Sequence, residues 1–373
     1  MKILIGADLV PTQTNCEIFA RGDREQMVGK ELGELLQSAD YRIFNLEVPL
    51  TDICTPIEKC GPALIAPVEV IAGYKALGID CLTIANNHIM DQGEQGFYST
   101  IKQLDENQIA YVGGGENLKE AAKPYIFEIE GKRIGIYGCA EHEFSIADND
   151  KPGANSFDPL ESLDHVSALK AQVDYVIVLY HGGKEHYRYP SPNLQKICRK
   201  LVEKGADLVV CQHSHCVGCE EKYLGGTIVY GQGNFLFDHS DSEFWQTSLL
   251  VQIGDGFQIS YIPLVKTGNA VRMAEECEIL DEFRMRSREI CENGFVERNY
   301  TEFAKSMVYS YLWRIYGHSC LFYRIINKLS GQRVNRYYLR HKLGKKLLGV
   351  WNAIECEAHR ELFLWALKNM GRK

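Results

Sequence analysis

The sequence has no run of apolar residues that reaches the length of about 18 needed to cross a membrane. No basic, apolar and small-residue pattern of a secretory signal precedes the strand-like run that begins at Lys2. The dense cysteine spacing of a small disulfide scaffold is also missing, because the 13 cysteines are scattered from Cys16 to Cys356. We therefore expect a cytoplasmic protein that is soluble or, at most, peripheral to a membrane.

Acidic residues are absent from residues 303–354, a stretch that contains ten Lys and Arg residues, although the whole chain has a net charge of −8. Aromatic residues accompany these cations: Tyr309, Tyr311, Trp313, Tyr316, Phe322, Tyr323, Tyr337, Tyr338 and Trp351. Such helices could contact an anionic membrane surface or a membrane synthase, or bind an anionic polymer or its precursor. Alternatively, the aromatic side chains form a helical core and the cations face solvent. Sequence-specific binding of nucleic acid is not expected, since no recognition motif accompanies the charge.

The chain of 373 residues exceeds the roughly 250 to 300 residues at which a single core stops growing. Up to about Lys266, short apolar runs alternate with helical patterns, which is typical of a layered α/β domain. Past Ala274 the pattern becomes one of long helices. We predict an α/β (α+β) domain over residues 1–270 and a mainly helical, basic and aromatic region over residues 271–373.

Most of the strand candidates are apolar throughout, as expected for strands that are buried on both faces. These candidates are residues 3–7, 41–46, 81–85, 175–180 and 208–212. Helices are predicted over residues 68–76, 94–106 and 193–204. Two hairpins are predicted, over residues 125–139 with a turn at Gly131 and over residues 248–265 with a turn at Asp255 and Gly256. The antiparallel hairpins favour a mixed sheet or a two-sheet sandwich.

Residues that can bind a metal follow each of the main strand candidates. They are Asp8, Glu47, Asn87 with His88, His181, and His213 with His215. Each has an ordinary alternative explanation, such as a helix cap or a turn residue. However, ligands in layered α/β proteins gather beyond the carboxyl ends of strands, so these residues could meet on one rim. Imidazole mixed with carboxylate and amide oxygens is typical of hydrolytic sites with two divalent ions.

A CxxC pair, Cys216 and Cys219, follows the last of these histidines. It could form a zinc site of its own, but a single pair of this kind is a weak signal, and ordinary buried or surface thiols are the favoured interpretation.

Several segments occur in the order typical of one protein family. They are NLEVPLTD at 45–52, ANNHIMDQG at 85–93, HGGKEHYRYPSP at 181–192, QHSH at 212–215 and YGQGNFLFD at 230–238. Over about residues 1–265 the chain thus resembles the CapA proteins of capsule and poly-γ-glutamate synthesis, a family similar to the calcineurin-like metallophosphoesterases. The resemblance implies a four-layer α/β/β/α sandwich, here with a helical C-terminal extension, and a centre of two divalent ions of manganese, iron or zinc.

The resemblance also implies roles for the metal-binding residues. Asp8 and His215 would serve one ion, Asn87, His181 and His213 the other, and Glu47 would bridge the two. Two departures from the phosphoesterase pattern stand out. Leu9 and Val10 follow Asp8 where Asp-x-His is usual, and Glu47 replaces an Asp. One metal position could therefore be weak or empty.

By the same resemblance, His88 would act as general acid. Asp91 could orient it by accepting the second ring proton.

Charged residues near these motifs are candidates for substrate binding, namely Lys59, Glu141, Glu185 and Arg188. A lysine or arginine can hold a phosphate or carboxylate group, and arginine can do so through two parallel hydrogen bonds. Alternatively, these side chains are ordinary solvent-facing charges in loops.

Three functions are compatible with the sequence. The first is a metal-dependent hydrolase that acts on a phosphorylated or γ-glutamyl precursor in the biosynthesis of a capsule or other cell-surface polymer. The second is a non-catalytic assembly or export factor that keeps the metallophosphoesterase shell, and the third is a nucleotide phosphohydrolase. The reaction stays open at this level, because a dimetal centre stabilises negative oxygen charge on a phosphoryl group and on a carbonyl group alike.

Overall fold

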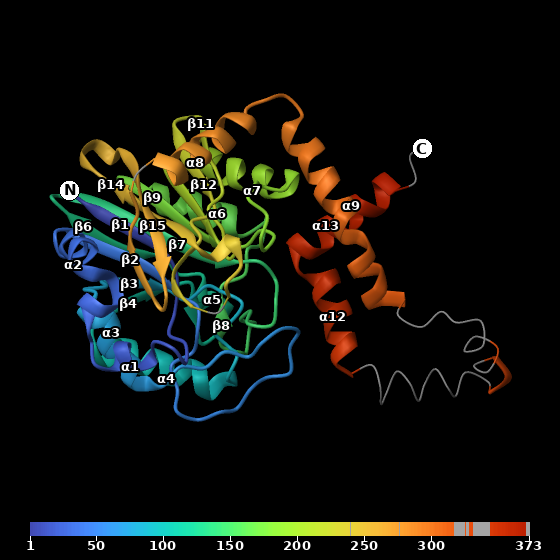
Figure 1. Ribbon diagram of the computed structural model, residues 1–373, viewed down its shortest axis with the longest axis horizontal. Coiled ribbons are helices and arrows are strands. Elements are labelled where there is room, and N and C mark those ends of the chain that lie inside the picture. The colour runs from blue at the N-terminus through green and yellow to red at the C-terminus, as the bar shows by residue number, and fades with distance from the viewer. Residues whose placement is uncertain (239, 276, 317–324, 326–327, 331–343, 371–373) are drawn as a thin grey trace.

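Two mixed β-sheets stack face to face in the computed structural model, which describes residues 1–238, 240–275, 277–316, 325, 328–330 and 344–370 (Figure 1). The larger, eight-stranded sheet has the order β16-β15-β14-β1-β2-β3-β4, and β13 also pairs with β1. Its strands are β1 (Ile3–Val10), β2 (Tyr41–Leu46), β3 (Cys81–Thr83), β4 (Ala110–Val112), β13 (Asn234–Phe237), β14 (Thr247–Ile253), β15 (Ile259–Thr267) and β16 (Ala270–Met273). The strands β1 to β4 are parallel to one another.

The smaller, six-stranded sheet has the order β11-β12-β10-β9-β7-β6. Its strands are β6 (Tyr125–Ile129), β7 (Lys132–Ala140), β9 (Tyr175–His181), β10 (Leu208–Gln212), β11 (Glu220–Tyr223) and β12 (Gly226–Tyr230). The four central strands β7, β9, β10 and β12 are parallel. A short ladder joins β5 (Gly114–Gly115) to β8 (Gly153–Ala154).

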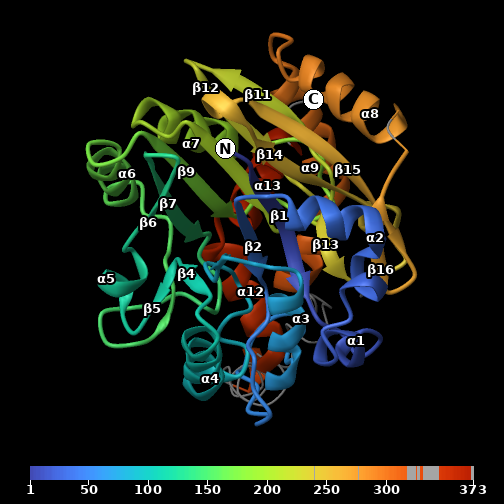
Figure 2. The ribbon, with the colours of Figure 1, turned by 90° about the vertical axis from the view of Figure 1, so that its left-hand side faces the viewer.

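Helices cover the outer face of each sheet (Figure 2). The larger sheet carries α1 (Cys16–Ala20), α2 (Arg24–Gln37), the 3-10 turn η1 (Val68–Val70), α3 (Ile71–Ala76) and α4 (Gly93–Glu106), and the smaller carries α6 (Ser162–Lys170) and α7 (Pro192–Glu203). Short helical turns elsewhere are α5 (Leu118–Ala121), η2 (Glu243–Trp245) and η3 (Asp255–Phe257). The four-layer α/β/β/α sandwich predicted from the sequence is therefore confirmed.

The continuous apolar character of the strands follows from this layering. Successive side chains of a strand point to opposite faces. In β1, Ile3 and Ile5 belong to the core between the two sheets, whereas Leu4 belongs to the core beneath the outer helices. Both faces of the strand are buried, so no polar residue interrupts the run until Asp8.

Both predicted hairpins form, as β6–β7 and β14–β15. Their turns contain Gly131 (φ 73°) and Gly256 (φ 65°), which adopt the left-handed backbone that glycine tolerates. The three predicted helices match α3 with η1, α4 and α7. The helix α2 was not predicted, because Gly29 and Gly33 weaken its helical pattern, and Gly29 (φ 74°) introduces a kink.

The C-terminal part is helical where the structure describes it. Its elements are α8 (Cys277–Glu289), α9 (Phe295–Tyr316), α12 (Gly344–Glu355) and α13 (Glu357–Met370). The helix α8 packs on β11 and β15 through Phe283. The helices α9, α12 and α13 lie together beside the sandwich (Figure 1). They share a core that includes Tyr300 and Leu362. The predicted division after residue 270 falls within β16, which still belongs to the larger sheet, and α8 begins at Cys277.

Most of the basic and aromatic stretch 303–354 lies outside the residues whose side chains the structure describes, so its predicted role in binding a polymer or membrane stays a prediction. Among the helices described, none combines the length and the apolar character needed to cross a membrane.

Candidate metal centre

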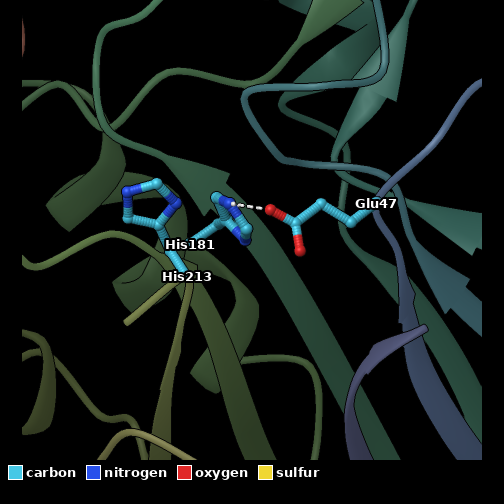
Figure 3. A group of neighbouring side chains, drawn as sticks. All are labelled: Glu47, His181 and His213. Carbon is cyan, nitrogen blue, oxygen red and sulfur yellow. Dashed lines mark ion pairs between the residues drawn. The ribbon is translucent and has the colours of Figure 1, made fainter. Parts of the chain in front are cut away.

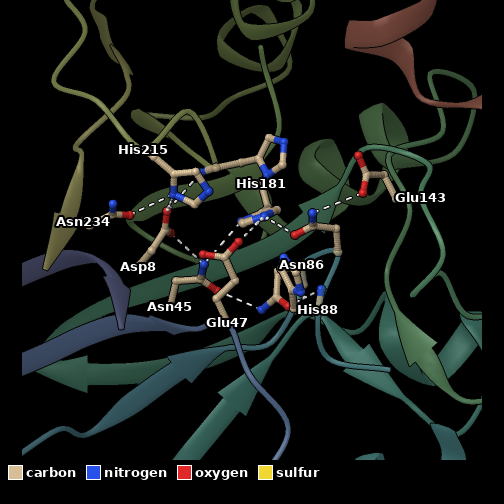
Figure 4. A network of polar contacts seen from close by, with 12 residues as sticks. Asp8, Asn45, Glu47, Asn86, His88, Glu143, His181, His215 and Asn234 are labelled. Carbon is tan, nitrogen blue, oxygen red and sulfur yellow. Dashed lines mark hydrogen bonds and ion pairs between the residues drawn. The ribbon is translucent and has the colours of Figure 1, made fainter. Parts of the chain in front are cut away.

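The parallel strands of the two sheets end at one rim, and the predicted metal-binding residues lie there (Figure 4). In the larger sheet Asp8 pairs with Asn45 of β2, and in the smaller sheet His181 of β9 pairs with Gln212 of β10. The register of β1 against β2 shifts between Ile5 and Asp8. Such an irregularity turns a side chain away from its regular direction. The rim thus gathers side chains from both sheets, as the strand ends predicted.

Glu47 is fully buried, and within the part of the chain that the structure describes neither of its carboxylate oxygens accepts a hydrogen bond. Its Oε1 lies 3.4 Å from Nε2 of His181 (Figure 3). Burial and the nearby Asp8 raise the pKa of Glu47 well above its ordinary value. A buried polar group without a partner costs free energy, of the order of 1 to 3 kcal/mol or more. A bound cation would supply the missing partner for both oxygens and would favour the charged carboxylate.

Two groups of candidate ligands share Glu47. One consists of Asp8, Glu47 and His215, and the other of Glu47, His181 and His213. Within each group the ligand atoms lie within 4.8 Å of one another. A carboxylate that bridges two ions must belong to both groups, as Glu47 does. The two groups agree with the ligand sets expected from the sequence. Metal ligation itself stays a prediction.

The histidines differ in charge. Burial, outweighing the attraction of Asp8, lowers the pKa of His181 to about 4. Burial and the neighbouring imidazoles lower the pKa of His213 well below its ordinary value. Both rings are therefore neutral at pH 7, the form that binds metals. Burial also opposes charge on His215, but Asp8 and Glu47 outweigh it and raise that pKa to about 9 in the absence of metal.

The backbone of the segment after β10 is strained at both of its histidines. His213 (φ 87°) and His215 (φ 54°) adopt left-handed conformations that cost side chains other than glycine about 1 to 3 kcal/mol each. The same conformations bring the two rings to the rim, where their centroids lie 5.9 Å apart. Strain retained at this place is consistent with selection for a site rather than for stability.

Amide side chains hold the candidate ligands in place. Asn87, which was predicted, lies with its Oδ1 3.0 Å from Nε2 of His181. Asn45 and Asn234 were not predicted. Asn45 donates a hydrogen bond of 2.8 Å to Asp8, and Oδ1 of Asn234 lies 2.9 Å from Nδ1 of His215. Both belong to sequence segments that resemble CapA proteins, so the segments contained a signal for them. Such contacts fix the orientation of metal ligands.

The expected partnership of His88 with Asp91 is present. Nδ1 of His88 lies 2.5 Å from Oδ2 of Asp91, which leaves Nε2 for a substrate. Burial and the ammonium group of Lys59 lower the pKa of His88 to about 4, although Asp91 opposes them. The ring is therefore mostly neutral at pH 7. To act as a general acid, His88 would need a proton on both ring nitrogens, and this charged form is favoured by Asp91 and disfavoured by Lys59.

Lys59 lies beneath His88 rather than in an open cleft. Its ammonium group donates to Asp91 (2.5 Å) and to the backbone oxygen of Asn87 (2.9 Å), and only 3% of its side chain is exposed. This ion pair does not favour the predicted contact of Lys59 with substrate. It indicates instead that Lys59 positions Asp91 and, through it, His88.

We expect Lys59→Met to lower the free energy of unfolding by about 3 to 5 kcal/mol, because it leaves the buried Asp91 carboxylate without its charged partner. Urea unfolding in the presence of a chelator measures this loss without a contribution from bound metal. The control is Lys30→Met, which removes an exposed lysine 3.9 Å from Glu34 and should change the stability little. Equal stability of the Lys59 variant and the wild type would show that the ion pair is not formed.

The other predicted substrate-binding residues differ in their contacts with the rest of the protein. Glu185 forms a third group of possible ligands with His213 and His215. Burial alone would raise the pKa of Glu185, but Lys184 and the histidines lower it to about 2, so the carboxylate is charged. Arg188 lies over the ring of Phe244, 4.8 Å from its centroid.

Glu141 is buried and accepts a hydrogen bond of 3.1 Å from the backbone of Gly183. Binding of substrate by any of the four stays a prediction.

The CxxC pair does not form a metal site with its neighbours. Cys216 and Cys219 are both buried, and in the described part of the chain neither belongs to a group of three side chains that could hold an ion. Burial raises the pKa of each thiol, as expected for inert structural cysteines.

The residues at the rim fit a pair of divalent ions. The supporting observations are the two unpartnered oxygens of Glu47, the unpartnered Nδ1 of His213 and the neutral imidazoles that face these oxygens. Nitrogen and oxygen donors in this mixture suit manganese, iron or zinc.

Comparisons with known proteins show that the chain is similar to capsule synthesis proteins. A family model described as "Bacterial capsule synthesis protein PGA_cap" matches residues 3–239. The capsule biosynthesis protein CapA of Bacillus anthracis is 32% identical over 220 residues, which is 57% of this chain and 54% of that protein. The PGA biosynthesis protein CapA of Bacillus subtilis (strain 168) is 31% identical over 173 residues, 46% of each chain. The chain thus spans about half the length of the curated relatives it matches.

Among solved structures, a 5'-nucleotidase precursor from Thermus thermophilus has a TM-score of 0.40 and 14% identity, and the match covers 82% of this chain and 59% of that chain. This similarity is too distant to bear on activity. The family model, by contrast, covers more than half of the chain and includes every candidate ligand at the rim. The resemblance to CapA proteins is confirmed, and the chain belongs to the bacterial capsule synthesis protein family PGA_cap.

Proposed function

We propose that the chain is a metal-dependent hydrolase that acts on a phosphorylated or γ-glutamyl precursor in the synthesis of a capsule or another cell-surface polymer. The observation that carries the proposal is Glu47, a fully buried carboxylate with two unpartnered oxygens that belongs to two groups of candidate ligands at once. A protein without a bound cation would gain stability by losing such a group. Its presence is explained by a function that uses it.

In this proposal Asp8, Glu47 and His215 hold one ion, and Glu47, Asn87, His181 and His213 hold the other. The ions would supply Lewis-acid stabilisation of the negative charge that develops on an attacked phosphoryl or carbonyl oxygen. Glu185 is close enough to His213 and His215 to complete the first set, in which Val10 stands at a position where a histidine is usual.

His88 would deliver a proton to the leaving group through Nε2. Asp91 would hold the Nδ1 proton, so that the ring keeps one orientation and its charged form is favoured. Lys59 would act as a positioning residue through its ion pair with Asp91. The site therefore separates the groups that bind metal from the group that moves a proton.

The substrate class is proposed from the family. The names of the two Bacillus relatives refer to capsule and PGA biosynthesis, and a precursor of such a polymer carries phosphate, carboxylate or γ-amide groups. Arg188 and Lys184 lie near the rim and offer positive charge for an anionic substrate.

The test is hydrolysis of a panel of phosphomonoesters, phosphodiesters, nucleotides and γ-glutamyl amides by protein reloaded with manganese, iron or zinc. The proposal expects turnover of a phosphoester or γ-glutamyl compound in the reloaded protein and none in Glu47→Ala. Turnover confined to nucleotides would instead assign a nucleotide phosphohydrolase. Bound metal with no turnover of any compound would contradict the hydrolase and favour a non-catalytic role.

A second candidate, an assembly factor that contacts an anionic membrane surface, is favoured by one observation. Leu347, Trp351 and Ile354 of α12 are 44%, 55% and 60% exposed, and their spacing places them on one face of the helix. They belong to the stretch 303–354 with its ten cations. Exposed apolar side chains in a sequence stretch rich in Lys and Arg suit an anionic lipid surface.

We expect the wild type to sediment with vesicles of anionic lipid but not with neutral vesicles, and the double variant Leu347→Asp with Ile354→Asp to remain in solution. The matched control is Leu224→Asp, because Leu224 is 75% exposed and lies on the β11–β12 turn, distant in sequence from α12. Equal sedimentation of all three proteins would exclude α12 as the contact.

A further inference from the structure

A cysteine and a histidine from the C-terminal helices lie against the loop that follows β7. Cys356 occupies the break between α12 and α13 and is buried, and His359 lies in the first turn of α13. Glu143 faces them from the loop. The two helical residues are more than 200 positions from Glu143 in the sequence, so only the packing of the C-terminal helices on the sandwich brings the three together.

The three side chains are close enough to bind one ion. Their ligand atoms all lie within 4.8 Å of one another, and Nε2 of His359 is 4.0 Å from Oε1 of Glu143. Zinc binds sulfur at about 2.3 Å and nitrogen or oxygen at about 2.0 to 2.2 Å, so two of its ligands lie at most about 4.5 Å apart. Small side-chain movements would satisfy this limit. Only 12% of the His359 side chain and 8% of the Glu143 side chain are exposed.

Further carboxyl groups lie next to these three side chains. Glu141 accepts hydrogen bonds from Sγ of Cys356 (3.6 Å) and from the backbone of Ala358 (3.3 Å), and Glu357 pairs with His142 at 2.8 Å. A cation at this place would add positive charge beside these carboxyl groups, of which Glu357 already pairs with His142 and Arg360.

We propose that Glu143, Cys356 and His359 form a further metal site for a zinc-like transition ion, separate from the centre at the rim. A thiolate, an imidazole and a carboxylate are three ligands that zinc accepts, with the fourth position open to water. Binding converts the Cys356 thiol to a thiolate and releases its proton to solvent. The site does not depend on the proposed hydrolase activity.

The proposed site touches the centre at the rim through one residue. Nδ2 of Asn87 donates to Oε2 of Glu143 at 3.1 Å, while Oδ1 of the same amide lies 3.0 Å from His181. An ion on Glu143 therefore positions Asn87 and ties the C-terminal helices to the rim. Cys356 and His359 lie beyond residue 239, where the match to the family model ends, so two of the three proposed ligands lie outside the matched domain.

Cobalt(II) titration of the metal-free, reduced protein tests the proposal. Cobalt bound to a thiolate absorbs in the near ultraviolet by charge transfer from sulfur, which nitrogen and oxygen ligands do not produce. None of the ligands proposed at the rim is a cysteine, so the band cannot come from the centre at the rim, and Cys356→Ser tests which thiol produces it. We expect the band in the wild type and in Glu47→Ala, its loss in Cys356→Ser, and at least a tenfold weaker affinity for cobalt in His359→Gln.

The controls are Cys54→Ser and Cys291→Ser, which change exposed cysteines outside the group and should keep the band. If Cys356→Ser does not fold, as judged by circular dichroism, His359→Gln alone decides the question, because its ring is partly exposed. Absence of the band in the wild type overturns the proposal even if cobalt binds at the rim. A band that persists in Cys356→Ser also overturns it and would point to another thiol, such as the CxxC pair.

Discussion

His213→Ala is expected to remove bound metal from the centre at the rim. After chelation and reloading with manganese, the wild type should contain about two ions per chain, since sites of this composition hold two. His213 offers a neutral, buried imidazole next to Glu47, and loss of a direct ligand should weaken binding by more than the roughly 10- to 100-fold that is typical of residues that only support a ligand. Elemental analysis measures the effect.

Manganese is the ion for this measurement, because it prefers oxygen and nitrogen ligands to thiolate. An ion bound by Cys356 should therefore not add to the number of ions measured. His165→Ala is the matched control, since His165 lies on α6 beside Tyr137 and away from the rim. A wild type that holds no metal after any reloading would remove the basis of the hydrolase proposal. If metal stays bound in both His213→Ala and Glu47→Ala, the metal site lies elsewhere in the protein.

The free energy of unfolding should also report the binding of metal at the rim. An ion that binds only the folded state at 100 times its dissociation constant adds about 2.7 kcal/mol to the free energy of unfolding. We expect manganese to stabilise the wild type by at least this amount at saturation, and Glu47→Gln to show no such gain.

His88→Ala is expected to keep both ions but to lower turnover by about 100- to 10,000-fold, the range that a positioned acid or base contributes. The reason is geometric. Asp91 holds one ring nitrogen of His88 at 2.5 Å, so the other is directed to a reacting group, while His88 itself belongs to neither of the ligand groups that contain Glu47.

The metal content of His88→Ala must be measured in parallel, because a loss of turnover with a loss of metal would have a different cause. Asp91→Asn should lower turnover as well, since it withdraws the charge that favours the protonated ring. If His88→Ala turns over every substrate of the panel at the wild-type rate, the residue is not the general acid.

Much of the fold could be predicted from the sequence because it is encoded locally. Strands buried on both faces appear as apolar runs, and a polar residue that reaches the rim interrupts or ends the run, as with Asp8 within β1 and His181 at the end of β9. Parallel strands present their carboxyl ends at a common edge, so the candidate ligands could be grouped before their positions were known.

Other features were not predicted, either because they depend on contacts between distant segments or because the local pattern is weak. Lys59 appeared as a loop charge near the site, but it is buried and paired with Asp91. The helix α2 was missed where glycines weaken its pattern.

The sequence by itself determined the layered architecture, the family and the candidate ligands of the metal centre, since periodicity, strand ends and short motifs are local properties of the chain. Only the tertiary structure decided that Glu47 lies unpartnered between two groups of ligands and that Cys356 and His359 meet Glu143. These are contacts between distant segments, and they arise from the stacking of the two sheets and the docking of α12 and α13, which no local pattern specifies.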